Sequence, residues 1–280
     1  MGYRTLLVHL QLGSPNTGLL NIAGELAQRY QSKVIGIAAG RPLDFGVTDG
    51  FAAGIVYISG EAIQEDRDEM DREIAVAEAD FRAALAGRAE AIEWRSSVTY
   101  EVLSDCLVRQ ARSADLILSN VSTAGFEPMR RVDTGDLVMR SGRPVLIVPR
   151  KQQSLSLDHI LVAWKDTREA RRAVADALPL LKKAAQVTVH EVARDDDLDS
   201  ARAHVEDVKA WLARHGIGAV GSVSACASDD AAHLDSIAAE AKADVVVAGI
   251  YGHNRMREWV FGGVTRDLLL REHRCALVSH

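Results

Sequence analysis

DVVVAGIYGHNRMREWVFGGVT, residues 244–265, is the stretch of the sequence that decides the fold. It opens with the apolar run Val245–Ala248, which is too short for a helix and is typical of a strand buried on both faces of a parallel sheet. Thr265 and Asp267 then give the composition of a first helical turn. A loop with glycines lies between strand and helix. This order offers bare backbone N–H groups and a positive helix end to a phosphate.

The spacing of these glycines carries a resemblance to a known family. Gly-x-x-Gly, nine residues, then Gly and a small residue is similar to the nucleotide-binding signature of universal stress proteins, and Gly249, Gly252 and Gly262 match it. Gly263 stands where ATP-binding members usually carry Ser or Thr, and Thr265 supplies a hydroxyl two residues later. A motif is a hypothesis until its context is known, and the alternative is a glycine-rich connection without a ligand.

Length and composition limit the classes of protein that need to be considered. The 280 residues suit two domains of about 140 residues, each able to bury a core. The net charge of −6 argues against nucleic-acid or anionic-membrane binding. The start of the chain lacks a signal-peptide layout, and no apolar run approaches the roughly 20 residues that span a bilayer, so we expect a cytoplasmic protein. Three scattered cysteines predict neither a disulfide framework nor a zinc site.

Strands and helices alternate along the chain, and the series occurs twice. In the first half we expect strands at Tyr3–Leu10, Val34–Ala38, Ile92–Val98, Asp115–Ser119 and Pro144–Pro149, and helices at Pro15–Tyr30, Gly60–Gly87, Val102–Arg112 and Thr134–Arg140. The polar segment Lys151–Asp158 reads as a linker. The second series has strands at His159–Trp164, Val187–Val192, Ala219–Ser224, Asp244–Ala248 and Ala276–Ser279, and helices at Thr167–Lys183, Ala201–Gly216, Asp230–Lys242 and Gly263–His273.

This repeat predicts an α/β fold of two tandem, doubly wound, parallel five-stranded sheets, Rossmann-like, as in universal stress proteins. We expect a degenerate domain at residues 1–150 and a domain with the glycine motif at 158–280. Ligands in such sheets bind at the C-terminal strand ends where the strand order reverses, here between the first and fourth strands. We also expect the last strands of the two halves to pair, since this covers two open edges, and a homodimer is possible.

The resemblance implies which residues of the second half contact the nucleotide. The candidates are Ala163, Trp164, Lys165, Val189, Gly249, Gly252, His253, Gly262, Gly263, Val264 and Thr265. Lys165 replaces the Asp that commonly contacts the ribose or adenine; it could reach a phosphate instead, but it removes an acceptor. Asp166 and Glu169 have capping-box spacing, which favours a helix cap over a ligand contact.

The first half has lost the signature. Asn120, Thr123 and Val132–Asp133 stand where the second half has its glycines, and Gln11 replaces the Asp after the first strand. An acidic residue such as Asp133 at a helix start would repel phosphate. We therefore expect nucleotide binding in one half only.

The functional expectation is a stress-response binding and regulatory module, with ATP as the candidate cofactor of the second half. No catalytic or metal-binding residues are predicted, because the sequence lacks the motifs of hydrolases, P-loop ATPases and zinc sites, although slow ATP hydrolysis stays open. The alternatives are a nucleotide-free stress protein that acts through protein contacts, and an α/β enzyme that transfers an adenylyl group. The glycine-rich segment 39–59 is expected to form a lid or contact surface, or an insertion packed on its own domain.

Overall fold

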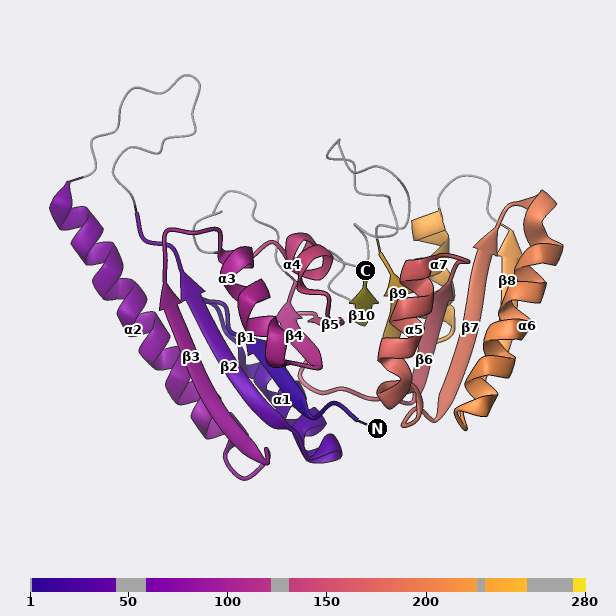
Figure 1. Cartoon of the computed structure of the whole chain (residues 1–280), viewed down its shortest axis with the longest axis horizontal. Helices are drawn as coiled ribbons and strands as arrows, with labels where there is room; N and C mark the ends of the chain where they lie inside the picture. The colour runs from indigo at the N-terminus through magenta and orange to yellow at the C-terminus, as the bar shows by residue number, and fades with distance from the viewer. Residues whose placement is uncertain (1, 44–58, 122–130, 226–229, 251–273) are drawn as a thin grey trace, which may run out of the picture.

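The computed structural model describes residues 2–43, 59–121, 131–225, 230–250 and 274–280, and strands and helices alternate throughout (Figure 1). The strands of the first half are β1 (Thr5–His9), β2 (Lys33–Gly40), β3 (Ala91–Val98), β4 (Leu116–Asn120) and β5 (Val145–Val148). Its helices are α1 (Thr17–Tyr30), α2 (Gly60–Leu85), α3 (Leu103–Gln110) and α4 (Thr134–Ser141), with a 3₁₀ turn at Ala111–Ser113.

The second half repeats the series. Its strands are β6 (His159–Trp164), β7 (Gln186–Ala193), β8 (Val220–Ala225), β9 (Val245–Gly249) and β10 (Cys275–Ser279). Its helices are α5 (Arg168–Leu181), α6 (Leu198–Arg214) and α7 (Asp230–Glu240), with a 3₁₀ turn at Asp195–Asp197. The helix expected at Gly263–His273 lies outside the described residues. None of the described helices is both long and apolar enough to cross a bilayer.

All ten strands of the described residues belong to one sheet, in the order β3-β2-β1-β4-β5-β10-β9-β6-β7-β8. Neighbouring strands within each half are parallel. The order reverses between β1 and β4, and again between β6 and β9. The doubly wound α/β class predicted from the sequence is therefore confirmed, and the two five-stranded sheets join into one.

The junction between the two halves is the pair β5–β10, whose strands run antiparallel. Ala276 pairs with Ile147, Leu277 with Leu146 and Val278 with Val145. All six side chains are at most 2% exposed. Each strand thus covers the edge that the other half would otherwise leave open, and an open apolar edge invites uncontrolled pairing.

Helices cover both faces of the sheet, which explains the apolar runs in the strands. Successive strand residues point to opposite faces, so Leu6 and Val8 lie in the core under α1 and α2, while Leu7 lies in the core under α3 and α4. In the second half α5 and α6 cover the first of these faces and α7 covers the other. Figure 1 shows α5 and α7 on opposite sides of the second-half strands.

Helix α2 packs where its period predicts, and it explains why β2 is longer than expected. Met70, Ala77, Phe81 and Leu85 are buried along one stripe of the helix. A Cβ on Gly40 would lie 2.3 Å from the Met70 sulfur, so this glycine lets β2 run beneath the helix. Residues 39 and 40 are therefore strand rather than the start of the glycine-rich segment, most of which lies outside the described residues.

Candidate functional site

The candidate site lies at the C-terminal ends of the parallel strands β6 and β9, and 'edge' refers below to this end of the strands. Ala163 of β6 pairs with Ala248 of β9, at the second reversal of strand order. After β9 the Ile250 N–H donates to the Ser279 carbonyl at 3.0 Å. The chain therefore leaves this edge beside the end of β10, and the glycine signature follows from there. Gly252, His253, Gly262, Gly263, Val264 and Thr265 lie outside the described residues.

The first glycine of the signature has a packing role. A Cβ on Gly249 would lie 2.2 Å from the backbone nitrogen of Ala170 and 2.3 Å from the carbonyl carbon of Glu169. Cβ atoms do not approach backbone so closely, which means that only glycine lets the first turn of α5 rest on the end of β9. The glycine thus brings a helix N-terminus, with its positive dipole end, to the edge of the sheet.

The cap of α5 differs from the sequence prediction. Thr167 is the N-cap residue, and its hydroxyl accepts a hydrogen bond from the Ala170 N–H at 3.2 Å. The expected cap by Asp166 is wrong, because the backbone turns helical one residue later. Asp166 instead accepts from Arg171 at 2.6 Å. Adjacent Asp and Thr are both good caps, and only the backbone geometry distinguishes them.

The candidate residues on strands β6 and β7 lie at different depths. Trp164 and Val189 are buried in the core beneath α5 and α6, and Val189 is 0% exposed. Ala163 points to the opposite face and packs against the core beneath α7. Lys165 is exposed in the loop that leads to α5. Any contact between Val189 and a ligand would therefore run through its backbone, whereas Lys165 can reach the edge with its side chain.

A buried carboxylate at the end of β7 was missed by the sequence analysis. Glu191 pairs with Trp164 across the strands and is 6% exposed. Its Oε2 atom makes no hydrogen bond with any described residue and lies 3.4 Å from Nδ1 of His204 on α6. Burial raises the pKa of Glu191; His204 and Lys165 act against this rise, and Asp166 adds to it. The only available signal was an acid in an otherwise mostly apolar strand.

A second buried carboxylate lies in the first turn of α5. Glu169 is 2% exposed and accepts a hydrogen bond from the Arg168 guanidinium, and its Oε2 atom has no hydrogen-bond partner among the described residues. Burial raises the pKa of Glu169, but the Arg168 hydrogen bond, a backbone hydrogen bond and the charges of Arg168 and His280 outweigh it. That pKa consequently lies below its usual value. This carboxylate is ionised near neutral pH.

The imidazole of His190 is held by serine hydroxyls of the neighbouring strand β8. Its Nδ1 atom lies 2.7 Å from the Ser222 hydroxyl and its Nε2 atom 2.9 Å from the Ser224 hydroxyl. Ser224 in turn contacts Nε2 of His233 at 2.8 Å. Burial, followed by the charge of His233, lowers the pKa of His190. Both ring nitrogens are engaged, so His190 has a structural role in this part of the sheet.

The corresponding edge of the first half is closed by its own side chains. The Asn16 amide oxygen accepts from the Gln11 N–H at 3.1 Å, and its nitrogen donates to the Gln11 and Ser14 carbonyls at 3.1 and 3.0 Å. Arg150 donates to the Gln11 side chain at 2.7 Å. Asn120, at the position matching Gly249, donates to the Val148 carbonyl at 3.1 Å.

The helix start in that half is occupied as well. Asp133 is the N-cap of α4, and its carboxylate accepts from the Asp136 N–H at 2.9 Å. A second carboxylate, that of Asp136 itself, lies in the first turn. The α4 N-terminus therefore already holds negative charge where a phosphate would have to bind.

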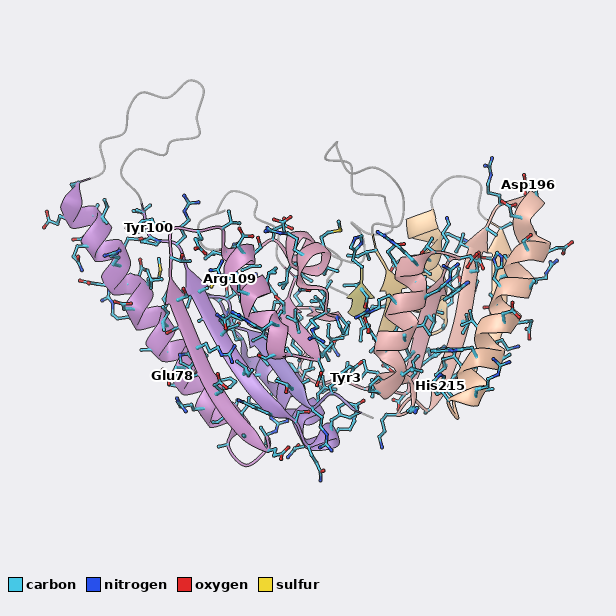
Figure 2. All side chains as sticks on the ribbon, in the orientation of Figure 1. Tyr3, Glu78, Tyr100, Arg109, Asp196 and His215 are labelled. Atoms are coloured by element: carbon cyan, nitrogen blue, oxygen red, sulfur yellow. The ribbon has the colours of Figure 1, made fainter. Side chains whose placement is uncertain are left out.

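The run of acidic residues in the second half, Asp195–Asp197, lies in solvent at the surface. Asp195–Asp197 are all exposed, and Figure 2 shows Asp196 at the outer end of that half. Within the described ranges, no group of three or more His, Cys, Asp or Glu side chains is arranged to hold a metal ion.

Comparison of the whole chain with solved structures identifies the class of fold. The fold is that of universal stress proteins. A universal stress protein from Archaeoglobus fulgidus matches with a TM-score of 0.73 at 14% identity, over 99% of this chain and 98% of its own. A functionally unknown protein from Pseudomonas aeruginosa PAO1 matches with a TM-score of 0.63 at 15% identity, over 99% of this chain and 92% of its own.

A universal stress protein solved in complex with cAMP matches a shorter part, 53% of this chain and 98% of its own, with a TM-score of 0.34 at 22% identity. No protein-family model and no curated protein matches the sequence.

Proposed function

We propose that the chain acts as a tandem universal stress protein, a stress-response binding and regulatory module that binds ATP or a related nucleotide in its second half. Residues 1–150 and 158–280 would form its two domains. The observation that carries the proposal is the edge where β6 and β9 end. Gly249 brings the α5 N-terminus onto that edge, and the glycine signature continues from it toward β10.

The chemistry of this edge suits the two ends of a nucleotide differently. Glycines at a helix start offer N–H groups to phosphate oxygens, and this is the role proposed for Gly252, Gly262, Gly263 and Thr265. Ribose hydroxyls and base amines need acceptors. Lys165 stands where related sequences commonly have Asp, so one acceptor is missing from this edge. Glu191 lies beside Lys165 and has an oxygen without a hydrogen bond to a described residue, so it supplies that acceptor.

The first half serves as a scaffold in this proposal. In the loop after β1 the Gln11 N–H is hydrogen-bonded to the Asn16 side chain, and the start of α4 carries Asp133 as its N-cap and Asp136 in its first turn. A nucleotide would have to displace these bonds and approach two carboxylates, so one nucleotide per chain is expected. We propose a binding role rather than catalysis, with any ATP hydrolysis slow.

Two measurements test the proposal. Mass spectrometry of small molecules released from the denatured, purified protein identifies a retained nucleotide, and calorimetric titration with ATP gives its stoichiometry. Gly262→Asp places a carboxylate in the glycine loop and should abolish binding. Gly218→Asp is the matched control, because it adds the same charge at an exposed glycine with open space around it.

The rival functions give other outcomes. Absence of ATP binding by the unaltered protein would overturn the nucleotide site and favour a module that acts through protein contacts. Two equivalent sites per chain would contradict the scaffold role of the first half. Release of AMP and pyrophosphate on incubation with ATP would favour adenylyl transfer.

A further inference from the structure

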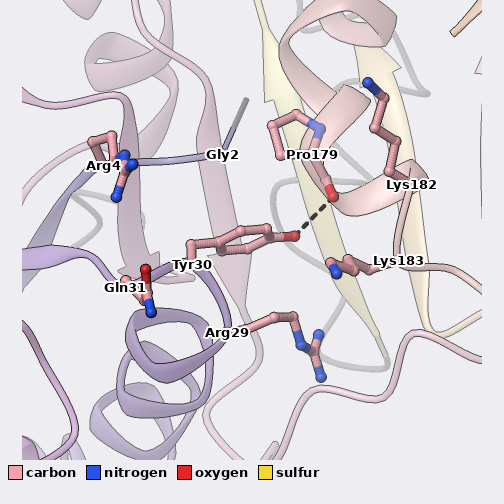
Figure 3. Close-up of a pocket in the computed structure, with 8 residues that line it drawn as sticks. All are labelled: Gly2, Arg4, Arg29, Tyr30, Gln31, Pro179, Lys182 and Lys183. Atoms are coloured by element: carbon pink, nitrogen blue, oxygen red, sulfur yellow. Dashed lines mark hydrogen bonds between the residues drawn. The ribbon is translucent and has the colours of Figure 1, made fainter.

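A second polar site lies at the edge of the sheet opposite the C-terminal ends of β6 and β9. A pocket of about 410 Å³ opens there between the C-terminal ends of α1 and α5, beside the residues that precede β1 (Figure 3). Its lining therefore comes from both halves of the chain. The volume falls in the range of pockets that hold small molecules, roughly 300–1,000 Å³.

The lining is strongly basic. Arg4 and Arg29 come from the first half and Lys182 and Lys183 from the second, and no acidic side chain from the described part of the chain lines the pocket. None of these four side chains forms an ion pair with a described residue, and all four are exposed. In a chain of net charge −6, four cationic residues thus line one small cavity.

Helix ends account for part of this charge only. Cations near a helix C-terminus are favourable because of the helix dipole, and this suits Arg29 in the last turn of α1 and Lys182 after α5. The dipole does not explain Arg4, which precedes a strand, nor the absence of any carboxylate among the lining residues. Like charges around one cavity repel one another, and a bound anion would relieve that repulsion.

The floor of the pocket is a fixed contact between the halves. The Tyr30 hydroxyl donates to the Pro179 carbonyl at 2.9 Å, which Figure 3 shows as a dashed line. Tyr3 donates to the Asp176 carbonyl at 2.7 Å, and its ring meets the Tyr30 ring edge-on at 5.4 Å between centroids. Figure 2 shows Tyr3 where the two halves meet. Burial raises the pKa of Tyr30 to about 12, so its phenol stays neutral and bonded.

We propose that this pocket binds a compact polyanion with at least two phosphate groups, held by Arg4 and Arg29 on one side and Lys182 and Lys183 on the other. Arginine forks match phosphate oxygens in pairs, and lysines add point charges. A bound polyanion touches both halves, so it links them at the edge opposite the C-terminal ends of β6 and β9. This site is independent of the proposed nucleotide site.

Calorimetric titration with sodium tripolyphosphate, at low and at physiological salt, tests the proposal. We expect one pocket-bound tripolyphosphate per chain, weaker at higher salt because exposed charges are screened. Arg29→Gln with Lys183→Gln should weaken binding by about tenfold or more, since two charge-assisted contacts are lost. The matched control is Arg72→Gln with Arg82→Gln, two exposed cations of α2 that lie away from the pocket.

Three outcomes would overturn the site: no binding at low salt, an equal loss in both double variants, or a loss with Gly262→Asp that the pocket variant does not share. Citrate that binds as tightly as tripolyphosphate would overturn the assignment to phosphate. A rise in melting temperature with tripolyphosphate, absent in the pocket variant, would support the tie between the halves.

Discussion

Gly249 and Ala170 are in direct backbone contact: the end of β9 lies so close to the first turn of α5 that a Cβ on Gly249 would sit 2.2 Å from the Ala170 nitrogen. This contact fixes the helix N-terminus at the candidate site. The packing of α5, and the ligand binding proposed for this edge, therefore depend on the same glycine.

Gly249→Ala should destabilise the protein. The added methyl group meets backbone, which cannot rotate away, and overpacking of this kind costs about 1–3 kcal/mol. Urea unfolding measures the loss. Gly218→Ala is the control, since nothing lies within 4 Å of that position, and it should change the free energy of unfolding by less than about 0.5 kcal/mol. Equal effects of the two substitutions would show that α5 can shift.

Glu191→Gln should weaken ATP binding by about tenfold, as expected for loss of a charged acceptor. If the carboxylate of Glu191 had only a structural role, its replacement would leave the affinity for ATP unchanged. Burial raises the pKa of Glu191, which means that its charge costs stability, so the variant should be at least as stable as the unaltered protein at pH 8. Glu206→Gln removes the same charge from the exposed face of α6 and should leave affinity unchanged. Unchanged affinity in Glu191→Gln would remove Glu191 from the site.

His9 should make the stability depend on pH. Burial lowers the pKa of His9 from 6.5 to about 4. As the pH falls, the unfolded chain therefore takes up this proton first. The stabilisation is fully present above pH 6.5 and is lost as the pH falls toward about 4, by about 3 kcal/mol in all.

Denaturant unfolding at steps between pH 7 and pH 4.5 measures this loss. His9→Gln, which keeps a polar partner for Ser119, should flatten the pH dependence. A slope that persists unchanged in His9→Gln would assign the proton uptake to other groups.

Leu277→Ala should destabilise both halves together. Leu277 is 0% exposed and pairs with Leu146 across the junction, and loss of a buried leucine costs about 2–5 kcal/mol. Because one sheet crosses the junction, far-UV circular dichroism and tryptophan fluorescence should report one coincident transition. Val220→Ala, at a position 58% exposed, is the control. Two separate transitions would mean that the halves unfold independently.

The sequence predicts the strands well, because a strand buried on both faces needs a continuous run of apolar residues and such a run is visible locally. Val245, Val246 and Val247 are 0–1% exposed, and their apolar run alone identified β9. The start of α6 was less clear. The helix begins at Leu198 rather than Ala201, since the acidic run before it forms a 3₁₀ turn that reads from composition as plain loop.

The site was harder to predict, because its features depend on residues far apart in the chain. The need for glycine at position 249 arises from the approach of α5, and the burial of Glu191 arises from α6. The basic pocket joins Arg4 and Arg29 with Lys182 and Lys183, which follow them by more than 150 residues in sequence, so no window of sequence contains it.

The β5–β10 junction has a consequence for how this protein can evolve. Two identical subunits that met through such a strand pair would carry every mutation twice, once on each side of the symmetry axis. Here the two sides are encoded separately, so Asn120 can replace a glycine in one half while Gly249 stays in the other. The covalent link frees the assembly from symmetry, and one half can specialise while its copy preserves the sheet.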